Sequence, residues 1–318
     1  MSDTQKYVLS QVCWIFIQLF IISFVIFVLL RAAIPGDALQ ARFQKSSEKT
    51  LDQIRHELGW DRNIVVQYGD YMFNFVQGDF GDSLQYDQKT VWELLKPKLW
   101  KTMQLSFMAF IIGFPTGILL GLLAARWSGT WKDPALIGGL MIPSSIHSII
   151  FVQLLILIFA VKLGLLPVGG WGGLFSLNSI IPLIVLVLPG LASGARFTRA
   201  NALHVINEGY VRTAYAKGLS ERRVLLRHVL PNAAHPILYP LIVDFPLIFV
   251  TGFLFVEIEY GIQGTGSFMV ESLRSLDYNV IMATSIMIAA VVLIMRRVAD
   301  IAIGVFDPRV RIGKAKRF

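Results

Sequence analysis

Residues 9–30 read LSQVCWIFIQLFIISFVIFVLL and contain no charged side chain. A bilayer core needs about 20 mostly apolar residues per helix, so this run predicts a transmembrane helix. The run is too long for the hydrophobic core of a signal peptide, and Arg31 follows it where a cleavage site would need small residues. We therefore expect a helix that is retained in the membrane.

The composition of the whole chain agrees with a membrane protein. Of its 318 residues, 55% are hydrophobic and only 16% are charged, and the mean hydropathy is +0.61. Soluble globular domains are usually about a quarter charged and less than half apolar, and disordered chains are more polar still. The single cysteine, Cys13, excludes an intramolecular disulfide and a cysteine-based metal cluster.

Five further apolar runs are long enough to cross a bilayer. They lie at about 102–125, 136–161, 180–200, 237–256 and 280–305. The last run ends in charged residues, so we expect it to leave the hydrocarbon near Met295 and to continue along the interface, where arginine side chains can reach water. The sequence thus predicts an all-α polytopic membrane protein with six transmembrane helices. It divides into a first helix (1–35), an extracytoplasmic segment (36–100) and a five-helix core (101–318) that contains a cytoplasmic loop at 201–236.

The distribution of charge predicts the orientation. If both termini are cytoplasmic, that side holds 17 of the 29 basic residues and only 6 of the 21 acidic residues. Cytoplasmic loops of membrane proteins carry such an excess of Lys and Arg. The net charge of +8 therefore indicates an N-in, C-in topology and does not indicate binding to nucleic acid.

The loop between the fourth and fifth runs is predicted to form two short helices within 208–231. In the first, Ala214 and Gly218 are four residues apart and share a face that is nearly bare of side chains, which another protein could approach closely. In the second, Ser220 is placed to cap the helix, and Pro231 is expected to end it. An apolar stripe of Val224, Leu225 and Val229 also allows an alternative, an amphipathic linker on the inner membrane surface.

The spacing in this loop resembles the EAA loop of the membrane subunits of bacterial ABC importers. Four residues match that motif: Ala214, Gly218, Leu230 and Pro231. Three depart from it, since Arg212, Thr213 and His228 stand where the motif has Glu, Ala and Ile. The run YVRTAYAKGLS at 210–220 is similar to the dipeptide and oligopeptide permease form of the loop.

Shorter matches to the same family extend over nearly the whole chain. In chain order, they lie at 35–37, 58–59, 66–68, 78–81, 163–164, 166–167, 169–170, 256–257 and 307–309. One stretch departs: where the family tends to have a Trp-Pro-Gly-x-Gly turn after the fifth span, this chain retains two glycines, Gly264 and Gly266, without the Trp and Pro.

The resemblance implies a type I ABC importer permease fold and a role in coupling. It implies that the cytoplasmic loop inserts as a coupling helix into a groove on a separate ATPase subunit, and that the helix bundle then rocks between inward and outward access. The residues implied in this coupling are Arg212, Thr213, Ala214, Lys217, Gly218, Leu219, Ser220, Glu221, Leu230 and Pro231.

The resemblance also implies partners. The chain has no Gly-x4-Gly-Lys-Ser/Thr phosphate loop, so we expect no enzymatic activity and no cofactor in this chain, with ATP and Mg²⁺ bound by two ABC ATPase subunits. A paralogous permease subunit would complete the pathway, and an extracytoplasmic substrate-binding lipoprotein would deliver a peptide, with residues 36–98 helping to dock or gate it. The assembly would lie in the plasma membrane of a bacterium, in contact with membrane lipid.

Two acidic residues are candidates for the translocation pathway. Asp244 falls within the fifth run, where an acid costs roughly 2.5–3.5 kcal/mol and should face the bundle interior or water. Glu257 lies at the outer end of the same run. For each, the structural alternative is a hydrogen bond to a neighbouring helix or a place at the interface. Gly113, Gly117 and Gly121 are expected to serve close helix packing, and Pro115, Pro143 and Pro189 to kink their helices.

Other functions remain open alternatives at this point. The same machinery could import nickel chelates, glutathione or another small solute. An ion-driven secondary transporter would be expected to show inverted repeats and several intramembrane acids, and it would leave the 208–231 loop unexplained. A membrane-embedded enzyme would need a constellation of catalytic groups, which the sequence does not offer.

Overall fold

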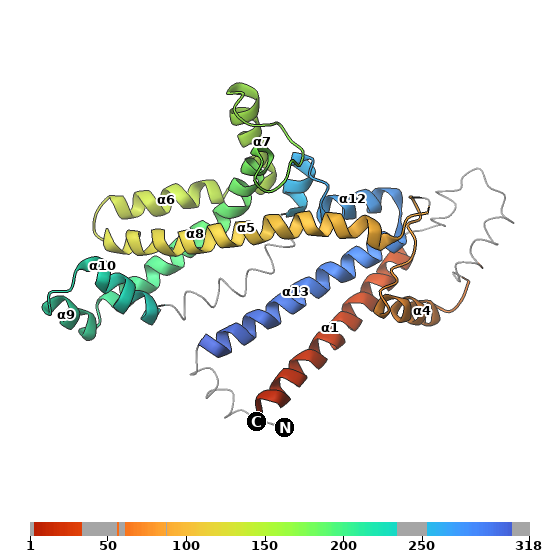
Figure 1. Cartoon of the computed structure of the whole chain (residues 1–318), viewed down its shortest axis with the longest axis horizontal. Coiled ribbons are helices and arrows are strands. Elements are labelled where there is room, and N and C mark those ends of the chain that lie inside the picture. Colours follow the sequence, from red (N-terminus) through yellow and green to blue (C-terminus); the bar gives the residue numbers. More distant parts are fainter. Residues whose placement is uncertain (1–2, 34–55, 57–60, 87, 234–252, 307–318) are drawn as a thin grey trace. The chain divides into compact units, whose positions relative to one another are not determined.

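The computed structural model describes residues 3–33, 56, 61–86, 88–233 and 253–306 (Figure 1). Within these ranges the named elements are helices, and one isolated antiparallel bridge joins Asp82 and Thr90. The chain forms two compact units. The first contains residues 1–99 and 268–293, and the second contains residues 100–267 and 294–318.

Four of the described helices are long and apolar enough to cross a membrane. They are α1 (Asp3–Ala33), α5 (Val91–Arg126), α8 (Ile180–Ile206) and α13 (Tyr278–Phe306). They contain the first, second, fourth and sixth runs of the sequence prediction. Large apolar side chains such as Trp14, Phe16 and Phe20 of α1 are exposed, as expected of surfaces that face lipid.

The third predicted span is broken. Helix α6 (Lys132–Ser144) and helix α7 (Ser148–Leu155), which continues as the π-helical η1 (Ile156–Lys162), are bent by 99° with respect to each other. The break directly follows Pro143, as the predicted kink required. The hydroxyls of Ser144 and Ser145 both donate to the carbonyl of Met141, at 2.9 and 2.8 Å, and so satisfy the end of α6.

The fifth predicted span lies mostly outside the described residues, and so does Asp244. Residues 253–260, at its C-terminal end, are helical.

In the first unit, helix α4 (Ile64–Val76) packs on α1 through aromatic side chains. Tyr68 makes edge contacts with Phe20, Phe24 and Phe27, with ring centroids 5.1 to 5.6 Å apart. Its hydroxyl lies 2.7 Å from the hydroxyl of Ser23. Part of the segment predicted to be extracytoplasmic is therefore an ordered helix anchored on the first span.

A buried carboxylate fixes the loop before α5 to the start of α13. Asp277, which is 1% exposed, accepts hydrogen bonds from the hydroxyl of Ser83 at 2.5 Å and from the backbone N–H of Gln85 at 3.2 Å. The amide of Asn279 donates to the carbonyl of Asp82 at 2.8 Å. This loop follows the Gly-Asp-Phe-Gly stretch at 78–81.

In the second unit, α5 and α8 pack backbone against backbone. A Cβ atom added to Gly113, Gly117 or Gly121 would lie 2.9, 2.7 or 2.5 Å from a backbone oxygen of α8. The predicted packing role of this glycine ridge is confirmed. Pro115 and Pro189 lie inside continuous helices, α5 and α8.

Candidate functional site

The loop after α8 folds into a compact unit. Its elements are α9 (Gly209–Ala216), α10 (Glu221–Val224) and the π-helical η3 (Leu225–Val229), and we refer to them as the α9–η3 unit. The two short helices predicted from the sequence are present. Five apolar side chains of the unit are buried and form one core with the ends of α5 and α8. The core is composed of Leu122, Ala125, Ala202, Val211, Ala214, Val224, Leu225 and Val229.

The position of Ala214 differs from the sequence prediction. Its side chain is 5% exposed and packs within this core, so the prediction of a bare face open to another protein is wrong for Ala214. Its small size lets α9 lie close to α5 and α8. The apolar stripe of Val224, Leu225 and Val229 is confirmed, and it serves the core of the chain itself.

Gly218 is exposed and has a specific backbone role at the end of α9. Its φ of +76° lies in the left-handed region that glycine tolerates best. The N–H of Gly218 donates to the carbonyl of Tyr215 at 2.9 Å, and the N–H of Leu219 donates to that of Ala214 at 3.3 Å. These two bonds form a Schellman motif, which ends a helix and satisfies its last carbonyls. The Ala–Gly spacing therefore has an explanation in local folding.

The expectation that Pro231 ends the second helix is wrong. Residues 230–233 are helical, and the five residues before them adopt π-helical hydrogen bonding. In this wider turn, the N–H of Leu230 bonds to the carbonyl of Leu225. The amide of Asn232 donates to the carbonyl of His228 at 2.7 Å. A π turn relieves the clash that a proline ring has with an ordinary α-helical turn, so the helix passes through Pro231.

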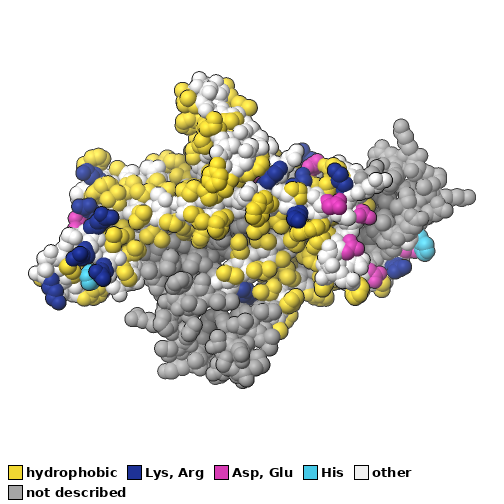
Figure 2. Space-filling model, in the orientation of Figure 1, with side chains coloured by type: hydrophobic (Ala, Val, Ile, Leu, Met, Phe, Trp, Pro, Cys, Tyr) yellow, Lys and Arg dark blue, Asp and Glu magenta, His cyan; other side chains and the backbone are white. Residues whose placement is uncertain are grey.

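The outer surface of the α9–η3 unit carries many basic side chains (Figure 2), together with the exposed rings of Tyr210 and Tyr215. Its exposed side chains include Tyr210, Arg212, Thr213, Tyr215, Lys217, Ser220, Arg222, Arg223, Leu226 and Arg227, and Pro231 just after the unit is exposed too. Burial, and then the charge of Glu221, raises the pKa of the Tyr215 phenol, which stays neutral and able to donate a hydrogen bond. Such a surface suits docking to a protein that carries acidic groups.

The remaining predicted coupling residues support the unit from within or at its edge. Leu219 and Leu230 are half-buried against the core. Ser220 takes the N-cap position of α10 with an extended backbone, and no capping bond is formed by its side chain. Glu221 is paired with Arg126, at the end of α5, at 2.9 Å.

Glu257, the second residue predicted for the translocation pathway, lies in a closed cluster of hydrogen bonds. Its side chain is 0% exposed. The carboxylate accepts from the hydroxyl of Thr102 at 2.5 Å and from the backbone N–H groups of Gly266 and Ser267 at 2.8 and 3.0 Å. The two N–H groups belong to the first turn of α12 (Thr265–Ser275), where the helix dipole favours a negative charge.

The two glycines near Glu257 leave room for its carboxylate. A Cβ atom on Gly264 would overlap the Glu257 carboxylate, and one on Gly266 would lie 2.8 Å from the backbone of Leu254. Because the carboxylate is fully buried and already accepts three hydrogen bonds, the geometry favours its structural alternative over contact with a transported molecule.

Contacts between residues far apart in the sequence escaped prediction. Asp133 binds Arg199, Ser83 binds Asp277, and Thr102 binds Glu257. Only the polarity of these residues within or beside apolar runs signals that they need partners. Among the described residues, no group of three or more His, Cys, Asp or Glu side chains could hold a metal ion.

Comparison with known proteins assigns the chain to a family. The family described as "Binding-protein-dependent transport system inner membrane component" matches residues 117–312, and the N-terminal component of such systems matches residues 4–106. The chain belongs to this family. As one of its inner membrane components, it is a multi-pass ABC transporter permease of a bacterial membrane.

Relatives of this inner membrane component align over nearly their full length. The oligopeptide transport system permease protein OppB of Salmonella typhimurium is 31% identical over 306 residues, which is 96% of this chain and 99% of the relative. The dipeptide transport system permease protein DppB of Lactococcus lactis is 32% identical over 308 residues, with the same coverage of both chains.

Solved structures resemble the component in fold. The inward-facing MetNI methionine ABC transporter matches with a TM-score of 0.54 at 18% identity, over 67% of this chain and 96% of that chain. An amino acid ABC transporter matches with a TM-score of 0.51 at 18% identity, over 68% of this chain and 94% of that chain. The fold is thus that of the ABC importer permeases.

Proposed function

We propose that this chain is the translocation subunit of an ATP-binding-cassette importer for peptides. The observation that carries the proposal is the similarity to oligopeptide and dipeptide permeases over 96% of the chain. In the proposal, the chain crosses the membrane six times with both termini in the cytoplasm. A paralogous permease completes the pathway, and a substrate-binding lipoprotein delivers the peptide from outside.

The proposal assigns ATP binding to two partner ATPases, with no cofactor in this chain. The α9–η3 unit docks on one of them through its exposed basic and aromatic surface. Support for this docking comes from the way the unit is held: its core is continuous with the ends of α5 and α8, so a displacement of the unit would be passed to both helices. Asp244 remains a proposed contact of the pathway.

Uptake by whole cells tests the proposed function. A strain that lacks the gene should fail to accumulate labelled di- and oligopeptides, and the gene on a plasmid should restore ATP-dependent uptake. A strain that keeps full peptide uptake but loses uptake of a nickel chelate or of glutathione would reassign the cargo. Uptake that persists after ATP depletion and collapses with the ion gradient would identify a secondary transporter.

Cross-linking tests the proposed docking surface. A cysteine in place of the exposed Thr213, in a Cys13→Ser background, should form a cross-link to an ATPase subunit in the assembled complex. A cysteine in place of Trp14, which is exposed on α1, is the matched control and should form none. Cross-linking at Trp14 without cross-linking at Thr213 would contradict the assignment.

A further inference from the structure

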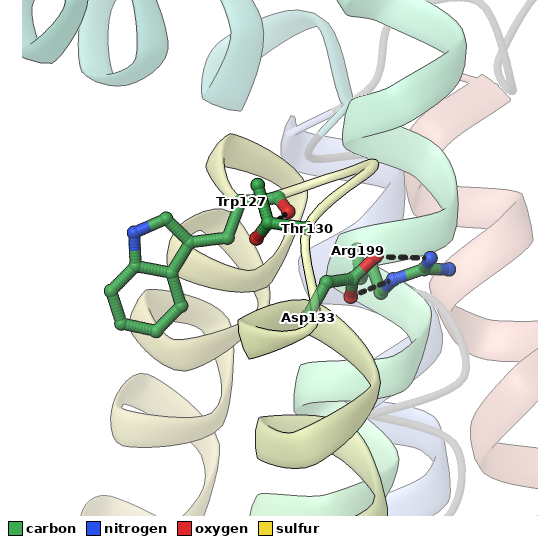
Figure 3. A network of polar contacts seen from close by, with 4 residues as sticks. All are labelled: Trp127, Thr130, Asp133 and Arg199. Carbon is green, nitrogen blue, oxygen red and sulfur yellow. Dashed lines mark hydrogen bonds and ion pairs between the residues drawn. The ribbon is translucent and has the colours of Figure 1, made fainter.

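Asp133 and Arg199 form a two-armed ion pair between α6 and α8 (Figure 3). The guanidinium Nε donates to Oδ1 at 2.5 Å, and Nη2 donates to Oδ2 at 2.6 Å. The side chain of Asp133 is 4% exposed and that of Arg199 is 34% exposed. Two parallel bonds fix the orientation of the groups as well as their distance, which a single-point contact would not.

The ion pair anchors the end of α6 at which the chain arrives from α5. Asp133 lies in the first turn of α6, where the helix dipole also favours its charge. In the turn before it, the hydroxyl of Thr130 donates to the carbonyl of Trp127 at 2.6 Å. Figure 3 shows the Trp127 ring pointing away from the ion pair.

On its other side, the ion pair is joined to the α9–η3 unit through α8. Only Asn207 and Glu208 separate the end of α8 from the start of α9. Ala202, one turn after Arg199, belongs to the core that α9 and η3 share with α5. At the same level, a Cβ atom on Gly121 would lie 2.5 Å from Thr198, so α5 and α8 touch there. These helix ends therefore form one block with the α9–η3 unit.

The far end of α6 has no such connection to α7. The span breaks at residues 145–147, and α7 leaves at 99° to α6. The backbone ladder of α6 runs as far as the N–H of Ser145, and the carbonyl of Met141 accepts from that N–H at 3.0 Å as well as from the hydroxyls of Ser144 and Ser145. A change of angle between α6 and α7 would break few hydrogen bonds.

We propose that Asp133 and Arg199 are positioning residues of transport, which make α6 move with the α9–η3 unit while the break at 145–147 takes up the motion. The inference rests on the proposed function, because it assumes that nucleotide binding by a partner displaces the α9–η3 unit. Apolar packing alone would let α6 slide on α8, whereas losing one partner of a buried ion pair leaves an uncompensated charge.

The first arm of the test measures distances in the complete complex. In a Cys13→Ser background, spin labels are attached to cysteines that replace Gly139 and Thr213, both of which are exposed. A Cβ atom at Gly139 would meet nothing within 4 Å. When Asp133 and Arg199 are unchanged, the distance between the labels at 139 and 213 should stay constant as ATP binds. A second label pair, at Gly139 and the exposed Ile150 of α7, should change its distance.

The second arm measures coupling. Asp133→Asn should lower the number of peptides taken up per ATP hydrolysed about three- to tenfold, and should broaden the Gly139–Thr213 distance distribution. Arg199→Lys keeps the charge but loses the two-armed geometry, and it should show the same defect. It replaces Asp133→Asn as the test if that variant does not assemble. Asp133→Glu should restore part of the coupling. Arg196→Lys, at an exposed arginine one turn earlier in α8, is the matched control and should leave the ratio unchanged.

The outcomes separate this inference from the proposed function. A wild-type complex that takes up no peptide overturns the proposed function, while the distances still report whether α6 follows the α9–η3 unit. A wild-type complex that takes up peptide, with Asp133→Asn lowering thermal stability but leaving both the ratio and the distances unchanged, would show that the pair is only structural and would overturn the inference.

Discussion

The α9–η3 unit and the Glu257 cluster hold their chain segments in opposite ways. The α9–η3 unit buries apolar side chains and turns its charges outward. The Glu257 cluster buries a charge and surrounds it with N–H and O–H donors from α5 and α12. The sequence distinguishes the first by the Ala–Gly spacing of Ala214 and Gly218, and the second as an acid at the end of an apolar run.

The difference predicts how each region responds to substitution. Apolar packing loses stability in proportion to the contacts removed, so the α9–η3 unit should tolerate many changes on its outer surface. A buried carboxylate depends on all its donors at once, because each donor left unpaired costs about 1–3 kcal/mol. A single substitution in the Glu257 cluster should therefore cause a large loss of stability.

The largest effect is expected at Glu257. Glu257→Gln keeps the shape of the side chain but points an amide N–H₂ at groups that are themselves donors, so we expect the complex to lose about 2–3 kcal/mol of stability. The measurement is thermal unfolding of the purified complex in detergent. Glu259→Gln, two residues away and partly exposed, is the matched control, with an expected change within about 0.5 kcal/mol. Equal effects at the two positions would contradict the closed cluster.

An intermediate effect is expected at Gly218. Substitutions there distinguish two reasons for a glycine, its backbone conformation and its docking to a partner. Gly218→Ala should cost about 1–2 kcal/mol, because an alanine at φ +76° is strained, while Gly218→Asn should cost less. Transport per ATP is measured beside thermal stability for both variants. If glycine is required because a partner approaches closely, the larger Asn side chain should lower transport per ATP more than Ala does. The order of the two variants in transport would then be the reverse of their order in stability.

The smallest effect is expected at the ion pair of Arg126 and Glu221. Both side chains are about half exposed, at 50% and 42%, so Arg126→Gln should cost less than about 1 kcal/mol. Its effect on thermal stability should vanish at high salt, since the charges are screened. A loss of stability that persists in high salt would contradict this assignment, because it would show that Arg126 holds the α9–η3 unit by more than a screened surface charge.

The spans were predictable because uncharged runs of this length have few alternatives to a transmembrane helix. The run at 102–125 could not reveal that α5 begins at Val91, since its first turns are amphipathic and lie outside the apolar stretch. Pro143 predicted a kink, and the structure shows a break of 99°. The size of a bend depends on what packs around it, which a local pattern does not contain.

The candidate site was predictable as a folded loop and only partly as a surface. Helical spacing placed Ala214 on one face of α9, and it could not tell whether that face turns toward α5 and α8 or toward solvent. The ion pair of Asp133 and Arg199 joins residues 66 positions apart, and the hydrogen bond from Ser83 to Asp277 joins residues 194 positions apart. Such partners are set by how helices meet in three dimensions.

The π-helical turn before Pro231 amounts to one residue more than an α-helix would use over the same stretch. Each residue turns an α-helix by about 100°, so deleting one residue between 225 and 229 would rotate everything after it by that angle. Ala233, now fully buried beside Phe114, would swing away from its neighbour, and the ring of Pro231 would meet an ordinary turn. The length of this stretch, more than the identity of its side chains, decides which way Ala233 faces.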